Sequence, residues 1–265
     1  MNPAELLLDW VARRVAGEAA VWWQAAVASV CTGADRALYT GVSLAARRLG
    51  KQGLRPQAAE LEAAHRLRPG WDPRDWTLDQ AARIGLLLAA ERGADDFSRR
   101  LDALCATADV DELVAFYRGL PLYPDAPRHR MRAAEGVRSN MKVVFEAVVH
   151  HNPYASEQFD EPAWNQMVLK ALFVGSPLAP IAGLDERANP ALARMLCDYA
   201  HERWAASRPI SPELWRCVGP FARGPMLADL ERAASAGTPA EREAALSALQ
   251  RAADPAAAEL LARLV

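Results

Sequence analysis

The sequence predicts an all-α protein, an irregular multi-helix array of about 12–14 short antiparallel helices. Apolar residues recur at three- and four-residue spacing along nearly the whole chain, without the alternation typical of strands. Connections between these segments are short, so successive helices should lie antiparallel beside one another. Four sites place a capping side chain directly before a proline, a pair typical of helix starts: Asn189-Pro190, Ser211-Pro212, Thr238-Pro239 and Asp254-Pro255.

The individual helices follow from these starts and from the apolar spacing between them. Thr77 with Gln80 and Thr238 with Glu241 have the spacing of a capping box, in which two residues satisfy each other's backbone N–H groups. Two irregular links rich in proline and glycine precede the fifth and tenth helices: 68–73 and 175–183. The predicted helices cover residues 3–15, 17–31, 34–49, 56–67, 77–92, 95–107, 109–118, 127–150, 161–173, 190–206, 212–218, 224–236, 239–252 and 255–264.

The C-terminal sixty residues predict short helix pairs, each with a leucine-bearing face. This pattern is typical of stacked helical repeats such as HEAT and armadillo arrays, although the chain shows no strict period. We therefore expect a solenoid-like arrangement within one helical domain spanning residues 1–265. Its expected sub-units are an N-terminal helical part at 1–122, a polar central part at 123–222 and a repeat-like part at 223–265.

Composition narrows the class of protein. The formal charge of −2 argues against a dedicated nucleic-acid binder, which usually carries a basic face. The sequence has no apolar run long enough to cross a membrane, and its first residues lack the features of a signal peptide. We expect a cytoplasmic protein whose four scattered cysteines are reduced. Trp10, Trp22 and Trp23 are expected to pack at a seam between helices.

Residues 132–205 differ in composition from the rest of the chain. This segment holds four of the five asparagines, three of the five histidines and two of the three lysines. The rest is dominated by Ala, Leu, Val, Arg and Glu, and the 28 arginines suggest a GC-rich genome that converts Lys to Arg. Residues that survive such drift are candidates for positions where substitution is costly, so function is expected in this segment.

Three predicted helices, 127–150, 161–173 and 190–206, are expected to meet there. Asn189 is left out of the ligand set because it is expected to cap a helix. Some Arg–Glu pairs are left out because they are expected to form internal ion pairs. The segment is also rich in cations, including Arg132, Arg187 and Arg194, so an anionic ligand is possible. The remaining side chains form the predicted ligand-binding set: Arg138, Asn140, Glu146, His150, Asn165, Lys170, Asp198 and His201.

A metal site is a weaker possibility within this set. Glu146, His150, Asp198 and His201 could combine as carboxylate and histidine ligands on facing helices. Their spacing departs from the Glu-x-x-His motif of di-metal bundles, so an ion-pair network is the competing interpretation. Sequence patterns identify no cofactor.

Nucleophilic catalysis is less well supported. Cys197 has His201 one helical turn later and is more simply a buried structural thiol.

Several long and unusual strings resemble the EboA domain protein family. The resemblance spans essentially the whole chain and is weakest in 90–120 and after 225. No catalytic residues are established for that family, so none is carried over. The strings are Leu67–Pro73, Arg132–Met141, Asn165–Phe173, Leu184–Pro190, Asp198–Trp204 and Ser211–Trp215.

The resemblance implies a place in a conserved secondary-metabolite gene cluster of the prenyl or cyclitol type. The neighbouring genes encode proteins resembling a prenyltransferase, a sugar-phosphate isomerase, a cyclase and a metal-dependent hydrolase. In cyanobacteria the cluster is associated with export of scytonemin monomer. The implied partners are other proteins of the cluster and a small-molecule intermediate.

Two functions stay open. The first is a non-catalytic helical protein that binds a partner protein or a pathway intermediate and is linked to precursor export. The second is an enzyme of the same pathway, possibly metal-dependent, with a polar pocket formed by residues 138–202. If the protein is an enzyme, the eight side chains should converge on one pocket. If it is a non-catalytic binding protein, these side chains should form internal ion pairs with one another.

Overall fold

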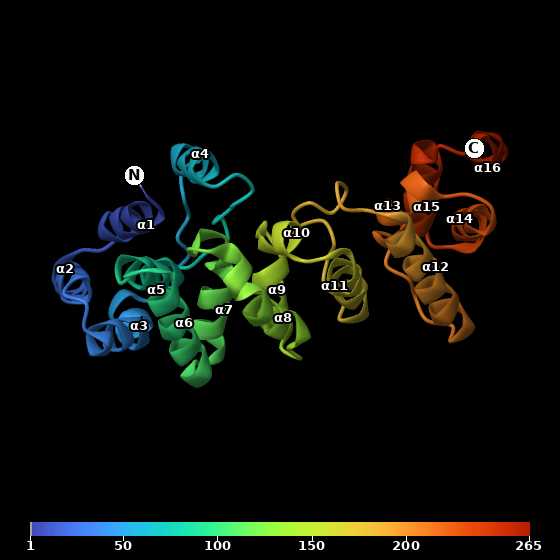
Figure 1. The fold of residues 1–265 in the computed structure, drawn as a ribbon. Coiled ribbons are helices and arrows are strands. Elements are labelled where there is room, and N and C mark those ends of the chain that lie inside the picture. The colour runs from blue at the N-terminus through green and yellow to red at the C-terminus, as the bar shows by residue number, and fades with distance from the viewer. Residues whose placement is uncertain (1) are drawn as a thin grey trace. The chain divides into compact units, whose positions relative to one another are not determined.

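The computed structural model describes residues 2–265 and confirms the all-α class (Figure 1). The described residues form sixteen α-helices and three short 3₁₀-helices without any β-strand. One isolated bridge pairs Gly53 with Thr77. In residues 2–265, no helix combines the length and apolarity needed to span a membrane. The chain divides into two compact units, Met1–Gln158 (unit 1) and Phe159–Val265 (unit 2).

Unit 1 is organised around one almost fully buried helix. Helix α5 packs against α1, α3 and α7 (Figure 1), and ten of its twelve residues are buried. The helices of unit 1 are α1 (Pro3–Ala12), α2 (Gly17–Cys31), α3 (Asp35–Leu49), α4 (Ala58–Leu67), α5 (Leu78–Ala89), α6 (Ala94–Thr107), α7 (Val110–Arg118), η1 (Leu120–Leu122), η2 (Ala126–His129), α8 (Arg130–Arg138), α9 (Lys142–Val149) and α10 (Tyr154–Gln158).

Most helices of unit 2 have a proline in their first turn. Helices α14, α15 and α16 pack against one another, and α12 contacts both α13 and α14 (Figure 1). Its helices are α11 (Glu161–Phe173), α12 (Pro190–Ala205), α13 (Leu214–Val218), η3 (Gly219–Phe221), α14 (Pro225–Ala236), α15 (Pro239–Arg251) and α16 (Pro255–Leu264).

Three of the four cap-proline predictions are confirmed. The side chain of Asn189 accepts a hydrogen bond from Leu192 N at 2.8 Å, and Asp254 accepts one from Ala256 N at 3.0 Å. Thr238 caps α15 within a complete capping box. At Ser211-Pro212 the helix begins later, at Leu214, with Glu213 as its N-cap.

The long helix predicted over residues 127–150 is wrong: α8 and α9 are separate. The chain leaves α8 at Ser139, whose hydroxyl oxygen accepts a hydrogen bond from Met141 N at 3.1 Å. Such a local bond competes with the helical pattern. Helix α9 then packs back against α8. At Gly136 a Cβ atom would lie 2.6 Å from Val148 Cγ2, so glycine permits this close approach.

The tryptophan seam has different partners from those expected. Trp10 and Trp23 are buried, as predicted, whereas Trp22 is half-buried. The ring of Trp10 stacks on Trp71 with centroids 6.0 Å apart, and Trp71 contacts Trp76 at 5.6 Å. The link before α5 therefore supplies core residues to unit 1.

Candidate functional site

The eight predicted ligand-binding residues divide equally between the two units. Arg138, Asn140, Glu146 and His150 belong to unit 1, and the other four belong to unit 2. In residues 2–265 no three His, Cys, Asp or Glu side chains stand close enough together to hold a metal ion. We therefore describe the two groups separately and derive no metal chemistry from them.

In unit 1 the break between α8 and α9 separates the four residues, which were expected on one helix. Arg138 ends α8 and Asn140 lies in the break, and both side chains are exposed. Glu146 lies 3.6 Å from Lys142 Nζ. His150 follows α9 with extended backbone, and its N–H donates to Glu146 O at 2.9 Å. His150 thus follows Glu146 by one turn, at the end of α9.

The asparagine and histidine next to this group have structural roles. The buried side chain of Asn152 donates to Tyr117 O at 3.0 Å and to Ala147 O at 3.1 Å, and it accepts from Tyr154 N. His151 adopts a positive φ of 53°, which is uncommon for a non-glycine residue. Its Nε2 lies 3.3 Å from Asp75 Oδ2. These contacts attach the loop after α9 to the link before α5.

In unit 2 Asn165 forms a reciprocal pair with the cap of α12. Asn165 Nδ2 donates to Asn189 Oδ1 at 3.2 Å, and Asn189 Nδ2 donates to Asn165 Oδ1 at 2.9 Å. Asn165 is buried, so its amide nitrogen and amide oxygen each have a hydrogen-bonding partner where water is excluded. This geometry favours a structural role for Asn165, joining α11 to the start of α12.

His201 joins α12 to α14. His201 Nε2 lies 2.6 Å from Asp229 Oδ1, and its ring lies 5.8 Å from that of Trp204. The guanidinium of Arg232 covers Trp204 at 4.2 Å. Asp198, in the same helix, is exposed.

Two further groups of unit 2 have pKa values shifted by burial. Burial raises the pKa of the Cys197 thiol to about 12, so this thiol stays protonated at neutral pH and is a poor nucleophile. Burial also lowers the pKa of Lys170 from its ordinary value.

Residues of α13 and its start hold the connection between α11 and α12 in place. The carboxylate of Glu213 accepts backbone hydrogen bonds from Leu178 N at 2.8 Å and Ala179 N at 2.9 Å. Arg216 makes a two-pronged contact with Asp185, at 2.7 and 2.5 Å. Glu213 and Arg216 therefore fix the residues that connect α11 to α12.

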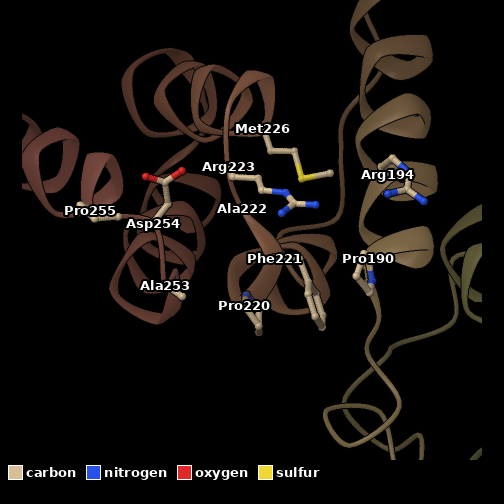
Figure 2. A pocket seen from close by; sticks show the side chains of 10 residues that line it. All are labelled: Pro190, Arg194, Pro220, Phe221, Ala222, Arg223, Met226, Ala253, Asp254 and Pro255. Carbon is tan, nitrogen blue, oxygen red and sulfur yellow. The ribbon is translucent and has the colours of Figure 1, made fainter.

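A pocket of about 450 Å³ lies within unit 2 (Figure 2). It has an apolar wall formed by prolines, Phe221 and Met226, and it has charged groups at its edge. Phe221 and Met226 are half-buried. We call this cavity the unit 2 pocket. Its lining residues are Pro190, Arg194, Pro220, Phe221, Ala222, Arg223, Met226, Ala253, Asp254 and Pro255.

Two arginines reach into the unit 2 pocket from different segments. Figure 2 shows Arg223 extending from the segment before α14 toward α12, and Arg194 lies on α12; both residues line the pocket. Both are exposed, and within residues 2–265 neither guanidinium group has a hydrogen-bonding or ion-pair partner. By contrast, Arg187 donates to Phe159 O at 2.9 Å and covers Trp164 at 4.8 Å. The two pocket arginines are thus available to an external anion.

Sequence reasoning found only one side of this pocket. Arg194 belongs to the predicted cation-rich segment, whereas Arg223, Phe221 and Met226 lie after it. The available signal was the proline-marked helix starts at Pro190, Pro225 and Pro255, but local patterns do not show that such starts meet.

Comparison with known proteins supports the resemblance found in the sequence. A family model described as "Metabolite traffic protein EboA" matches residues 3–219. No curated protein and no solved structure matches the chain. The match includes Pro190 and Arg194 but ends before Pro220, so most of the unit 2 pocket lies beyond it. Because the match spans well over half of the 265 residues, the chain belongs to the EboA family of metabolite traffic proteins.

Proposed function

We propose that this protein binds a small-molecule pathway intermediate non-covalently and acts in metabolite traffic by holding it in the unit 2 pocket. The observation that carries this proposal is the pocket itself, in which an apolar wall faces two arginines without protein partners. Ligand sites in proteins are typically concave and mostly apolar, with a few polar groups that fix orientation.

The size and construction of the pocket support the proposal. Its volume of about 450 Å³ lies within the usual range for sites that bind small molecules, roughly 300–1,000 Å³. Four segments contribute to it: α12, η3 with the residues after it, the first turn of α14, and the link between α15 and α16. All four belong to unit 2.

The family description favours binding over partner docking alone, because traffic of a metabolite requires that some component hold it. We further propose that the intermediate is passed to or from other proteins of the same gene cluster, in the cytoplasm, in support of precursor export. The resemblance of the sequence strings to the family suggests these partners.

The pocket can be tested by filling it. Ala253 lines the pocket and is exposed, so Ala253→Trp should obstruct the cavity without disturbing the core. Ala228→Trp is the matched control, because Ala228 is exposed on α14 and does not line the pocket. The readout is saturation-transfer NMR with a library of small aromatic and aliphatic fragments.

We expect a subset of fragments to bind the wild-type protein and Ala228→Trp, and to lose binding in Ala253→Trp. Thermal melting of each variant checks that the fold is retained. Fragment binding that is unchanged in a folded Ala253→Trp protein would contradict the proposal, as would the absence of any bound fragment.

A further inference from the structure

We propose that the ligand of the unit 2 pocket is an amphiphile with a single acidic group, a carboxylate or a phosphate, joined to an apolar ring or chain. This inference rests on the proposed function and adds the chemical class of the ligand. It follows from the positions of three kinds of group around the cavity.

The acidic group is placed by Arg194 and Arg223. Both residues line the same cavity from separate segments (Figure 2), and each guanidinium can donate paired hydrogen bonds to a carboxylate or phosphate. Several other arginines of this protein already contact a carboxylate, as Arg216 contacts Asp185. An acid that binds between Arg194 and Arg223 would not have to displace an existing carboxylate.

Helix starts around the pocket add to the preference for an anion. Pro190, Met226 and Pro255 line the pocket from the first turns of α12, α14 and α16. The N-terminal end of a helix carries a positive partial charge, equivalent to about half an elementary charge. Asn189 and Asp254 already cap α12 and α16, whereas α14 has no side-chain cap. The start of α14 therefore reinforces the field of the two arginines.

The apolar part of the ligand is placed by Phe221, Pro220 and Met226. Aromatic and thioether side chains pack against rings and alkyl chains alike. Asp254 limits the ligand to one acidic group. Its carboxylate caps α16 and lines the same cavity, so a second acidic group near it would meet like charge without a neutralising partner.

The test uses four probes with one carbon skeleton and different head groups. 4-Phenylbutyrate and 4-phenylbutyl phosphate are acids, 4-phenylbutanamide is neutral, and 4-phenylbutylamine is a cation. Isothermal titration calorimetry on the full chain gives a Kd for each, at low and at high salt.

Two double variants separate the arginines of the pocket from charge in general. Arg194→Gln with Arg223→Gln removes the proposed anion site. Arg47→Gln with Arg48→Gln removes the same charge from exposed positions of α3 in unit 1 and is the matched control. All four positions are exposed, so both proteins should fold normally.

We expect the acids to bind the wild-type protein at least tenfold more tightly than the amide, with the amine weakest and with the preference reduced by salt. The pocket double variant should bind acid and amide alike, and the α3 control should match the wild type. Comparison of carboxylate with phosphate identifies the preferred acid.

Equal binding of acid and amide to the wild type, with both lost in Ala253→Trp, would overturn the acidic class while leaving the proposed function in place. An acid preference that persists in the pocket double variant would also overturn it. Failure of every probe to bind the wild type would overturn both proposals.

Discussion

Arginines inside unit 1 and arginines at the unit 2 pocket are the same residue type in opposite situations. Arg83 is buried in α5, where it donates to Asp79 Oδ2 at 2.8 Å and to Val42 O at 3.2 Å. Arg100 is buried as well and contacts Asp35 at 2.9 Å. Arg194 and Arg223 are exposed and have no such partners within residues 2–265. The comparison teaches that cationic charge marks a ligand site only where the protein has not already neutralised it.

Breaking a buried ion pair in unit 1 should have the largest effect on stability. Asp79→Ala removes the close carboxylate partner of the buried Arg83 and leaves only Glu112, at 4.0 Å. We expect a loss of about 3–5 kcal/mol in the free energy of unfolding, measured by urea denaturation. The control is Glu62→Ala on the exposed surface, where Glu62 and Arg66 are 3.8 Å apart and each 72% exposed. That change should cost less than about 0.5 kcal/mol. Similar losses of stability in both variants would contradict the difference between the buried and the exposed ion pair.

The asparagine pair in unit 2 should have an intermediate effect. Asn165→Ala removes both hydrogen bonds between Asn165 and Asn189, and we expect a loss of about 1–3 kcal/mol in the free energy of unfolding. A double-mutant cycle with Asn189→Ala should show a coupling free energy of roughly 0.5–3 kcal/mol, because the two side chains hydrogen-bond to each other. Additive losses would show that the reciprocal pair does not stabilise the protein.

A buried histidine in unit 1 should make stability depend on pH. His129 packs between Phe97 and Tyr123, and burial lowers its pKa from the ordinary value of 6.5. Below pH 6.5 the unfolded chain binds a proton at this residue before the folded protein does, so stability falls as the pH falls.

The variant His129→Phe tests this titration. It should lose the hydrogen bond from Nε2 to Pro124 O and should flatten the fall in stability between pH 7 and pH 5, measured by urea denaturation across that range. A slope identical to that of the wild type would rule out His129 as the titrating group.

Removal of the pocket arginines should have the smallest effect on stability. Arg194→Gln with Arg223→Gln should change the free energy of unfolding by no more than about 0.5 kcal/mol, because exposed side chains without partners contribute little. Thermal and urea melts measure this change. A loss comparable to that of Asp79→Ala would show that these arginines are structural, as Arg83 is.

The fold was predictable where local chemistry determines it. Asn189, Thr238 and Asp254 begin their helices as expected, because a cap acts on N–H groups within three residues of itself. The break at Ser139 was missed, because the apolar spacing continues through it while a serine side chain competes with the helix.

The candidate site was predictable only in part. Unusual composition drew attention to residues 132–205, but Asn152, Asn165 and Asn189 in that segment form structural hydrogen bonds. A rare residue type marks a position of interest without showing whether folding or binding requires it. The ligand roles of the eight predicted residues stay a prediction.

The unit 2 pocket could not be predicted because it depends on tertiary packing. Its residues come from positions 190–194, 220–226 and 253–255, which are separated by whole helices. Each proline-marked start is readable in the sequence by itself. Their convergence depends on how α12, α14 and α16 pack, and that packing has no local pattern.

Native mass spectrometry of the protein isolated from cells that make it naturally tests the central claim most directly. The account predicts that the wild-type protein and Ala228→Trp carry a small molecule, released on gentle activation as an anion, and that Ala253→Trp does not carry it. A wild-type protein isolated without any bound small molecule, or one whose bound molecule persists unchanged in Ala253→Trp, would contradict the account.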